Sequence, residues 1–207
     1  DAFFSFMKRP KPTQALLIEQ LQHNLAQLAF LGIDLPESDR VRSSFPLRNH
    51  ELLVPCTVRD LSSTLLLVAV KGNRYVALHL GDGIIGYQYL NSRQQSVLAT
   101  LSRPENGEYT NETIFVPSAG AQDAIRLYTG RLNSDRRQVI GFILMSDGSE
   151  ACLYHKRTAQ LAPACEKFLA ACRALPREEM EDQLESTLIN VISKKTSDDC
   201  SLALLAR

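Results

Sequence analysis

The feature that most restricts the fold of this chain is a series of short apolar runs in its middle, separated by glycine-bearing turns. Three runs follow one another closely, with Lys71-Gly72-Asn73 and Gly81-Asp82-Gly83 between them, and both tripeptides are typical of tight turns. We therefore predict three consecutive antiparallel strands joined as a meander, and further strands wherever the pattern recurs. The predicted strands cover residues 64–70, 75–80, 84–90, 95–100, 113–116, 124–129, 138–145 and 201–206.

Helical patterns lie on both sides of this strand-rich region. Thr13 can cap a helix that runs to about Leu31, with leucines every three or four residues along one face. Residues 159–174 and 178–194 predict two more helices, and Pro176 suits the first turn of the second. Residues 32–59 are rich in Pro and Ser and predict a long surface excursion, either a substrate flap or an ordinary insertion.

The composition excludes several classes of function. The 207 residues contain 23 Lys plus Arg and 23 Asp plus Glu, so no overall charge favours nucleic acid or an anionic membrane. No apolar stretch is long enough for a membrane span and no targeting segment is visible, so we expect a cytoplasmic protein. The five cysteines form no CxxC pair, and we interpret Cys165 and Cys172 as buried free thiols on one helix face.

Three acidic corners share one pattern, in which an apolar run adjoins a short segment containing Asp with Gly or Ser. The segments are YVALHLGDG (75–83), GFILMSDGSE (141–150) and TSDDCSLALLA (196–206). Each one alone is a good turn signal. Together they allow Asp82, Asp147 and either Asp198 or Asp199 to meet at one end of a sheet, where carboxylate oxygens would suit Mg²⁺ or Mn²⁺.

Taken in order, SSTLLLVAV, HLGDGIIGYQ, GFILMSDGSE and SDDCSLALLA resemble the type-2C metal-dependent protein phosphatases, the PPM family, in its bacterial form. The resemblance covers roughly residues 61–206. It implies an α+β fold built as a four-layer αββα sandwich, in which two antiparallel sheets pack together and are flanked by helices. It also implies a phosphomonoester hydrolase that removes phosphate from phosphoserine and phosphothreonine in proteins by means of a metal-activated water.

The resemblance also implies metal ligands at particular positions. Asp147 and Asp198 would bind one of two catalytic Mn²⁺ or Mg²⁺ ions, with Asp199 in place of the family's Asn. Asp82 resembles the carboxylate that holds a third, weaker ion together with Asp147. Asp1, at the start of DAFF, resembles the remnant of the family's first acidic corner.

Two elements of the family pattern are not found: an Asp-Gly-x-Gly loop, which normally supplies the aspartate bridging both metals, and a clear phosphate-binding Arg. We therefore expect residues 1–207 to form a single phosphatase-like domain that lacks part of its amino-terminal metal-binding element. One alternative is an inactive domain of the same fold that serves as an interaction or regulatory module. A second is an unrelated α+β domain whose corners are only turns. The active enzyme would act on a phosphoprotein and pair with a cognate Ser/Thr kinase, without nucleic acid or membrane partners.

Two further features carry weaker signals. His79 lies on a predicted strand without a motif partner, and we interpret it as a structural histidine. The run YHKR at 154–157 would suit a solvated basic patch near a phosphate site, although nothing in its spacing is specific.

Overall fold

The computed structural model describes residues 63–104, 113–116, 118 and 120–207, which belong to one compact unit. Asp1, the helix predicted at 13–31 and the excursion at 32–59 lie outside the described residues. The described elements are, in chain order, β1 (Leu65–Lys71), β2 (Arg74–Leu80), β3 (Ile84–Asn91), β4 (Ser96–Ser102), α4 (Ala121–Ala124), β5 (Arg126–Arg131), β6 (Arg137–Met145), α5 (Asp147–Leu153), β7 (Tyr154–His155), β8 (Gln160–Leu161), α6 (Pro163–Ala174), α7 (Arg177–Thr187), the π-helical turn η3 (Leu188–Ile192) and β9 (Leu202–Ala206).

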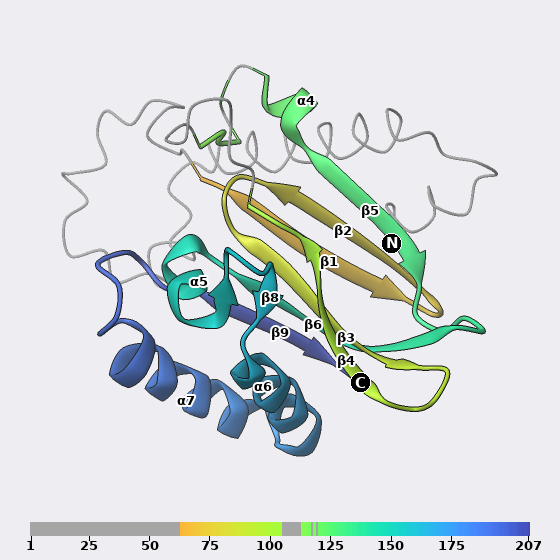
Figure 1. The fold of residues 1–207 in the computed structure, drawn as a ribbon. Coiled ribbons are helices and arrows are strands. Elements are labelled where there is room, and N and C mark those ends of the chain that lie inside the picture. Colours follow the sequence, from red (N-terminus) through yellow and green to blue (C-terminus); the bar gives the residue numbers. More distant parts are fainter. Residues whose placement is uncertain (1–62, 105–112, 117, 119) are drawn as a thin grey trace, which may run out of the picture. The chain divides into compact units, whose positions relative to one another are not determined.

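The strands form two main antiparallel sheets and one short pair (Figure 1). The first sheet has the order β1-β2-β5, the second has the order β4-β3-β6-β9, and β7 pairs with β8. The predicted meander is therefore wrong at its second turn, because β2 and β3 belong to different sheets. Gly81-Asp82-Gly83 carries the chain from one sheet to the other, and Gly81 adopts a φ of 104°, which a residue with a side chain rarely takes.

The two sheets pack face to face around an aromatic core. Tyr75 of β2 and Phe142 of β6 come from different sheets, and their ring centroids lie 5.1 Å apart. The next residue of β6, Ile143, points to the opposite face and packs with the buried Cys165 of α6. Both faces of β6 are thus covered, which explains why its sequence shows a continuous apolar run rather than polar alternation.

Helices α6 and α7 lie on the outer face of the four-stranded sheet, and α6 contacts β6 and β9 (Figure 1). The described residues therefore form two packed sheets and one helical layer, as expected for the predicted sandwich. The described residues do not include the second helical layer of the four-layer prediction. None of the helices in the described part is long and apolar enough to cross a membrane.

Two predicted elements differ from the structure in local detail. Residues 113–116 form no strand, and the backbone N–H of Phe115 instead donates to Ser118 Oγ at 3.1 Å in a turn. The helix predicted from residue 159 begins at Pro163, because residues 160–161 pair with β7 as β8. A seven-residue helix, α5, follows the strand that ends at Met145 and was not predicted as a separate element.

Candidate metal centre

Strand register brings the three acidic corners to one end of the four-stranded sheet. Met145, the last residue of β6, pairs with the first residue of β3 and with the first residue of β9. Asp82 lies just before β3, Asp147 begins α5 just after β6, and Asp198 lies just before β9. The convergence predicted from three separate sequence segments is therefore produced by the pairing of three neighbouring strands.

Two glycines allow the backbones of these corners to touch. A Cβ atom on Gly83 would lie 2.7 Å from the carbonyl oxygen of Met145, so the backbones of the first and second corners are in close contact here. A Cβ atom on Gly148 would lie 2.5 Å from the carbonyl oxygen of Asp199, so the backbones of the second and third corners are also in close contact. Real Cβ atoms essentially never approach so closely, so any larger residue would push the corners apart.

Serine hydroxyls fasten the second corner to the third, and the sequence analysis did not find this role. Ser146 Oγ donates to the carbonyl oxygen of Asp199 at 3.0 Å and accepts from the backbone N–H of Ser201 at 2.9 Å. The backbone N–H of Ser146 and the hydroxyl of Ser149 both donate to the carbonyl oxygen of Ser201, at 3.1 and 3.0 Å. The only sequence signal was the presence of serines on both sides of Asp147-Gly148.

The electrostatics of Asp147 show that the corner acids act on one another. The pKa of Asp147 is raised, first by desolvation and then by the charges of Asp82 and Asp198, together with a hydrogen bond to the Asp198 side chain. The backbone N–H of Gly148, which donates to Asp147 Oδ1 at 2.9 Å, lowers that pKa in the opposite direction. Asp82 is held by Thr113, whose hydroxyl donates to Asp82 Oδ2 at 2.7 Å. Carboxylates that share a site raise one another's pKa in this way unless a cation is present.

The donor set suits a hard divalent cation in its chemistry. Such ions take carboxylate oxygens and retain several waters, and Asp147 and Asp198 offer carboxylates close enough for the charge of Asp198 to raise the pKa of Asp147. Within the residues that the structure describes, no three His, Cys, Asp or Glu side chains are arranged to hold a metal ion. Asp147 and Asp198 would therefore serve as a partial ligand set, which such an ion could complete with water. The predicted ligand Asp1 falls outside the described residues.

A buried polar cluster next to the first corner agrees with a structural role for His79. Its imidazole is fully buried, Nε2 lies 2.9 Å from the carbonyl oxygen of Gly81, and Nδ1 lies 2.7 Å from Ser102 Oγ. The guanidinium of Arg126 lies 3.2 Å from Nδ1. Burial, followed by the charge of Arg126, lowers the pKa of His79 to about 4. The ring is therefore neutral at physiological pH and fixes the backbone of the Gly81 corner.

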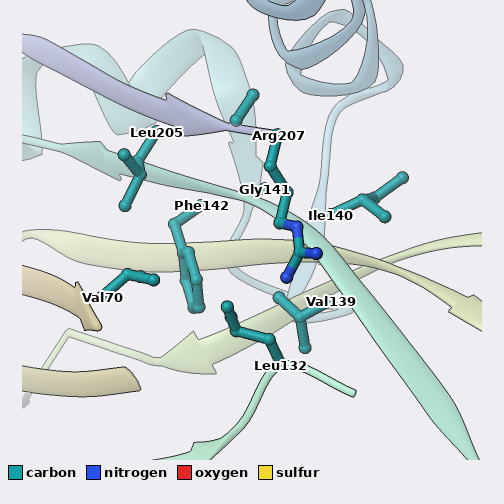
Figure 2. A pocket seen from close by; sticks show the side chains of 9 residues that line it. Val70, Leu132, Val139, Ile140, Gly141, Phe142, Leu205 and Arg207 are labelled. Atoms are coloured by element: carbon teal, nitrogen blue, oxygen red, sulfur yellow. The ribbon is translucent and has the colours of Figure 1, made fainter. Parts of the chain in front are cut away.

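The hollows of the molecule differ between its two ends. A cavity of about 80 Å³ lies at the end away from the acids, lined by apolar side chains that include Val70, Leu132 and Phe142 (Figure 2). Its described lining contains no Asp or Glu side chain, and it is several times smaller than the ~300 Å³ at which ligand pockets begin. A larger hollow of about 240 Å³ adjoins the corners and is lined in part by Ser146 and Ser201. Of these two hollows, the one that adjoins the acidic corners is the better candidate for the predicted phosphatase chemistry, because carboxylates lie beside it.

The fold and the acidic corners together define an α+β protein of two packed antiparallel sheets with carboxylates gathered where strands of one sheet end. The sequence profile of the protein phosphatase 2C family matches residues 1–189. The chain belongs to this family, as the resemblance of its motifs predicted.

Solved structures similar to this chain include bacterial serine phosphatases. One has 21% sequence identity and a TM-score of 0.42, with 69% of this chain and 57% of that chain covered. A point mutant has 18% identity and a TM-score of 0.44, with the same coverage. The matched region thus spans little more than half of the length of these proteins. No curated protein matches the chain.

Proposed function

We propose that this protein is a metal-dependent phosphatase that removes phosphate from phosphoserine and phosphothreonine in proteins. The observation that carries the proposal is the convergence of the Asp82, Asp147 and Asp198 corners in a chain of the protein phosphatase 2C family. Desolvation and the neighbouring acids raise the pKa of Asp147, as expected for carboxylates grouped to bind a cation when no cation offsets their charge.

Under this proposal Asp147 and Asp198 hold one Mn²⁺ or Mg²⁺ ion, and Asp82 with Asp147 holds a further, weaker one. Asp1 belongs to the proposed ligand set but lies outside the described residues. When bound, such ions neutralise the phosphoryl oxygens and lower the pKa of water that attacks phosphorus. The chain itself contributes the placement of the carboxylates, because Gly83 and Gly148 hold the corners in backbone contact.

The same proposal also includes the substrate, the kinase that phosphorylates this substrate, and the cellular location of the enzyme. The substrate would be a phosphoprotein, a Ser/Thr kinase would supply it, and the reaction would take place in the cytoplasm. We also propose that residues 1–207 form one phosphatase-like domain.

The test is metal-dependent phosphate release from a phosphoserine peptide and from p-nitrophenyl phosphate, with and without Mn²⁺. We expect Asp147→Asn and Asp198→Asn to lose more than about 100-fold in activity, because even groups that only support a ligand are worth roughly 10–100-fold. Asp135→Asn is the matched control, since Asp135 is an exposed acid between β5 and β6, outside the corners. Equal activity in all three variants and the wild type would refute the metal assignment.

A second candidate function is an inactive phosphatase-like domain that acts as an interaction or regulatory module. It is favoured by one observation, the lack of a complete three-ligand cluster among the described residues. Calorimetric titration with Mn²⁺ separates the two candidates. The enzyme requires binding that depends on Asp147, whereas the inactive module predicts no such binding and no phosphate release from any variant.

A further inference from the structure

An ion pair of unequal burial lies beside the acidic corners. The side chain of Glu150 is 4% exposed, whereas that of Lys156 is 74% exposed, and Glu150 Oε1 contacts Lys156 Nζ. The other carboxylate oxygen, Glu150 Oε2, is buried without a hydrogen-bond partner in the described structure. Burying a carboxylate in this way costs several kcal/mol unless it is compensated, so the pair is poorly explained as a device for stability alone.

The pair is positioned by the same elements as the metal centre. Glu150 lies three residues after Asp147 on α5, which places both on neighbouring positions of one helical turn. Lys156 lies in the turn between β7 and β8. This turn is fastened to the four-stranded sheet by Thr100, whose hydroxyl donates to the carbonyl oxygen of Ala159 at 3.2 Å.

The amine of Lys156 lies within the field of the corner acids as well as that of its partner. Its pKa is raised, first by the hydrogen bond with Glu150 and further by the charges of Glu150, Asp147 and Asp82, while desolvation acts in the opposite direction. The amine is therefore fully charged at neutral pH. A lysine ammonium has three N–H donors, and one contact with Glu150 leaves donors that can face a ligand.

We propose that Lys156 binds the phosphoryl group of the substrate at the edge of the acidic corners, and that Glu150 is a positioning residue that holds its amine there. This inference rests on the proposed phosphatase function and adds a substrate-binding group to it. A phosphoryl dianion that approaches several carboxylates is repelled unless cations offset their charge. Lysine is a common phosphate ligand that acts as a point charge, and here a buried carboxylate restricts where that charge can lie.

The experiment compares Lys156→Met, Lys156→Arg and Glu150→Gln with the wild type. Steady-state kinetics on a phosphoserine peptide at saturating Mn²⁺ gives KM and kcat, and calorimetry gives the affinity for inorganic phosphate. We expect Lys156→Met to raise KM and to weaken phosphate binding by about tenfold or more, as for the loss of one charged hydrogen bond. Lys156→Arg should restore most of the phosphate affinity, and Glu150→Gln should give an intermediate loss.

The matched control is Lys167→Met, which removes an exposed lysine from α6. A purely structural pair would lower the unfolding temperature and leave KM and phosphate affinity unchanged, which would overturn the inference. Equal phosphate affinity in Lys156→Met and Lys167→Met would also overturn it. If the wild type releases no phosphate from any substrate, the proposed function fails. Calorimetry with inorganic phosphate still tests the inference in that case. Phosphate binding that is weakened by Lys156→Met supports the inference, and phosphate binding that is unaffected by Lys156→Met refutes it.

Discussion

Gly148→Ala should separate the acidic corners without removing any carboxylate. Its Cβ would lie 2.5 Å from the carbonyl oxygen of Asp199, and 3.4 Å marks the start of ordinary contact. The third corner must therefore retreat by about 0.9 Å, several times the roughly 0.2 Å within which metal–ligand distances are held. Overpacking of this kind costs about 1–3 kcal/mol, offset by up to about 1 kcal/mol from alanine's better helix propensity.

We expect the Gly148→Ala variant to lose up to about 2 kcal/mol in unfolding free energy and at least about tenfold in Mn²⁺ affinity. Urea denaturation followed by circular dichroism measures the first, and calorimetric titration with Mn²⁺ measures the second. Gly130→Ala is the control, because its Cβ would lie 2.5 Å from the Tyr75 ring, at the far end of the other sheet. Wild-type Mn²⁺ affinity in Gly148→Ala, or an equal loss in Gly130→Ala, would refute the reasoning.

Two further predictions follow from buried groups. Because the pKa of His79 is about 4 when folded and about 6.5 when unfolded, protonation favours the unfolded chain, and stability falls as the pH drops from 6.5 towards 4 by about 3 kcal/mol. His79→Gln should flatten that part of the pH–stability profile measured by urea denaturation, and an unchanged slope would contradict the assignment. Burial raises the pKa of Cys165 to about 12, so iodoacetamide should modify it only after unfolding, whereas the partly buried Cys172 reacts earlier; peptide mass mapping distinguishes the two.

The strands could be predicted from the sequence because their signals are local. The bounds of β2, β3 and β9 fall within a residue or two of the predicted runs. Their partners could not be predicted, because pairing depends on contacts between distant parts of the chain. The turn at Gly81-Asp82-Gly83 satisfies the sequence rules for a hairpin, and yet it connects two sheets. The burial of β2 after Arg74 and of the first five residues of β3 favours this crossing, since an isolated two-stranded hairpin would leave one face in water.

The candidate site was partly predictable for a similar reason. Asp82, Asp147 and Asp198 could be named because each follows a recognisable local pattern, and the register of β6 explains why they converge. The hydrogen bond from Ser146 to the Asp199 carbonyl and the ion pair between Glu150 and Lys156 could not be identified from the sequence. Their partners are set by tertiary packing. The run YHKR showed only that positive charge was present, and the fold determines that Lys156 is the residue of this run that pairs with Glu150.

The charges of the corners lead to a last prediction about how metal and protons compete for them. The raised pKa of Asp147 means that the metal-free folded protein binds a proton there more tightly than the unfolded chain does. Its stability relative to Asp147→Asn should therefore rise as the pH falls from neutral towards that pKa. A bound cation reverses this dependence, because it requires the ionised carboxylate.

At 100 times its dissociation constant, Mn²⁺ should add about 2.7 kcal/mol to the unfolding free energy at neutral pH, and this gain should shrink as the pH falls. Urea denaturation of the wild type and of Asp147→Asn, each with and without Mn²⁺, gives the four unfolding free energies that this comparison needs. A stabilisation by Mn²⁺ that persists in Asp147→Asn would place the ion elsewhere. Equal pH dependence of the two metal-free proteins would contradict the raised pKa of Asp147. Opposite pH dependence with and without the ion is expected where desolvation and neighbouring charges favour a protonated Asp147 in the metal-free protein and a bound cation favours the ionised form.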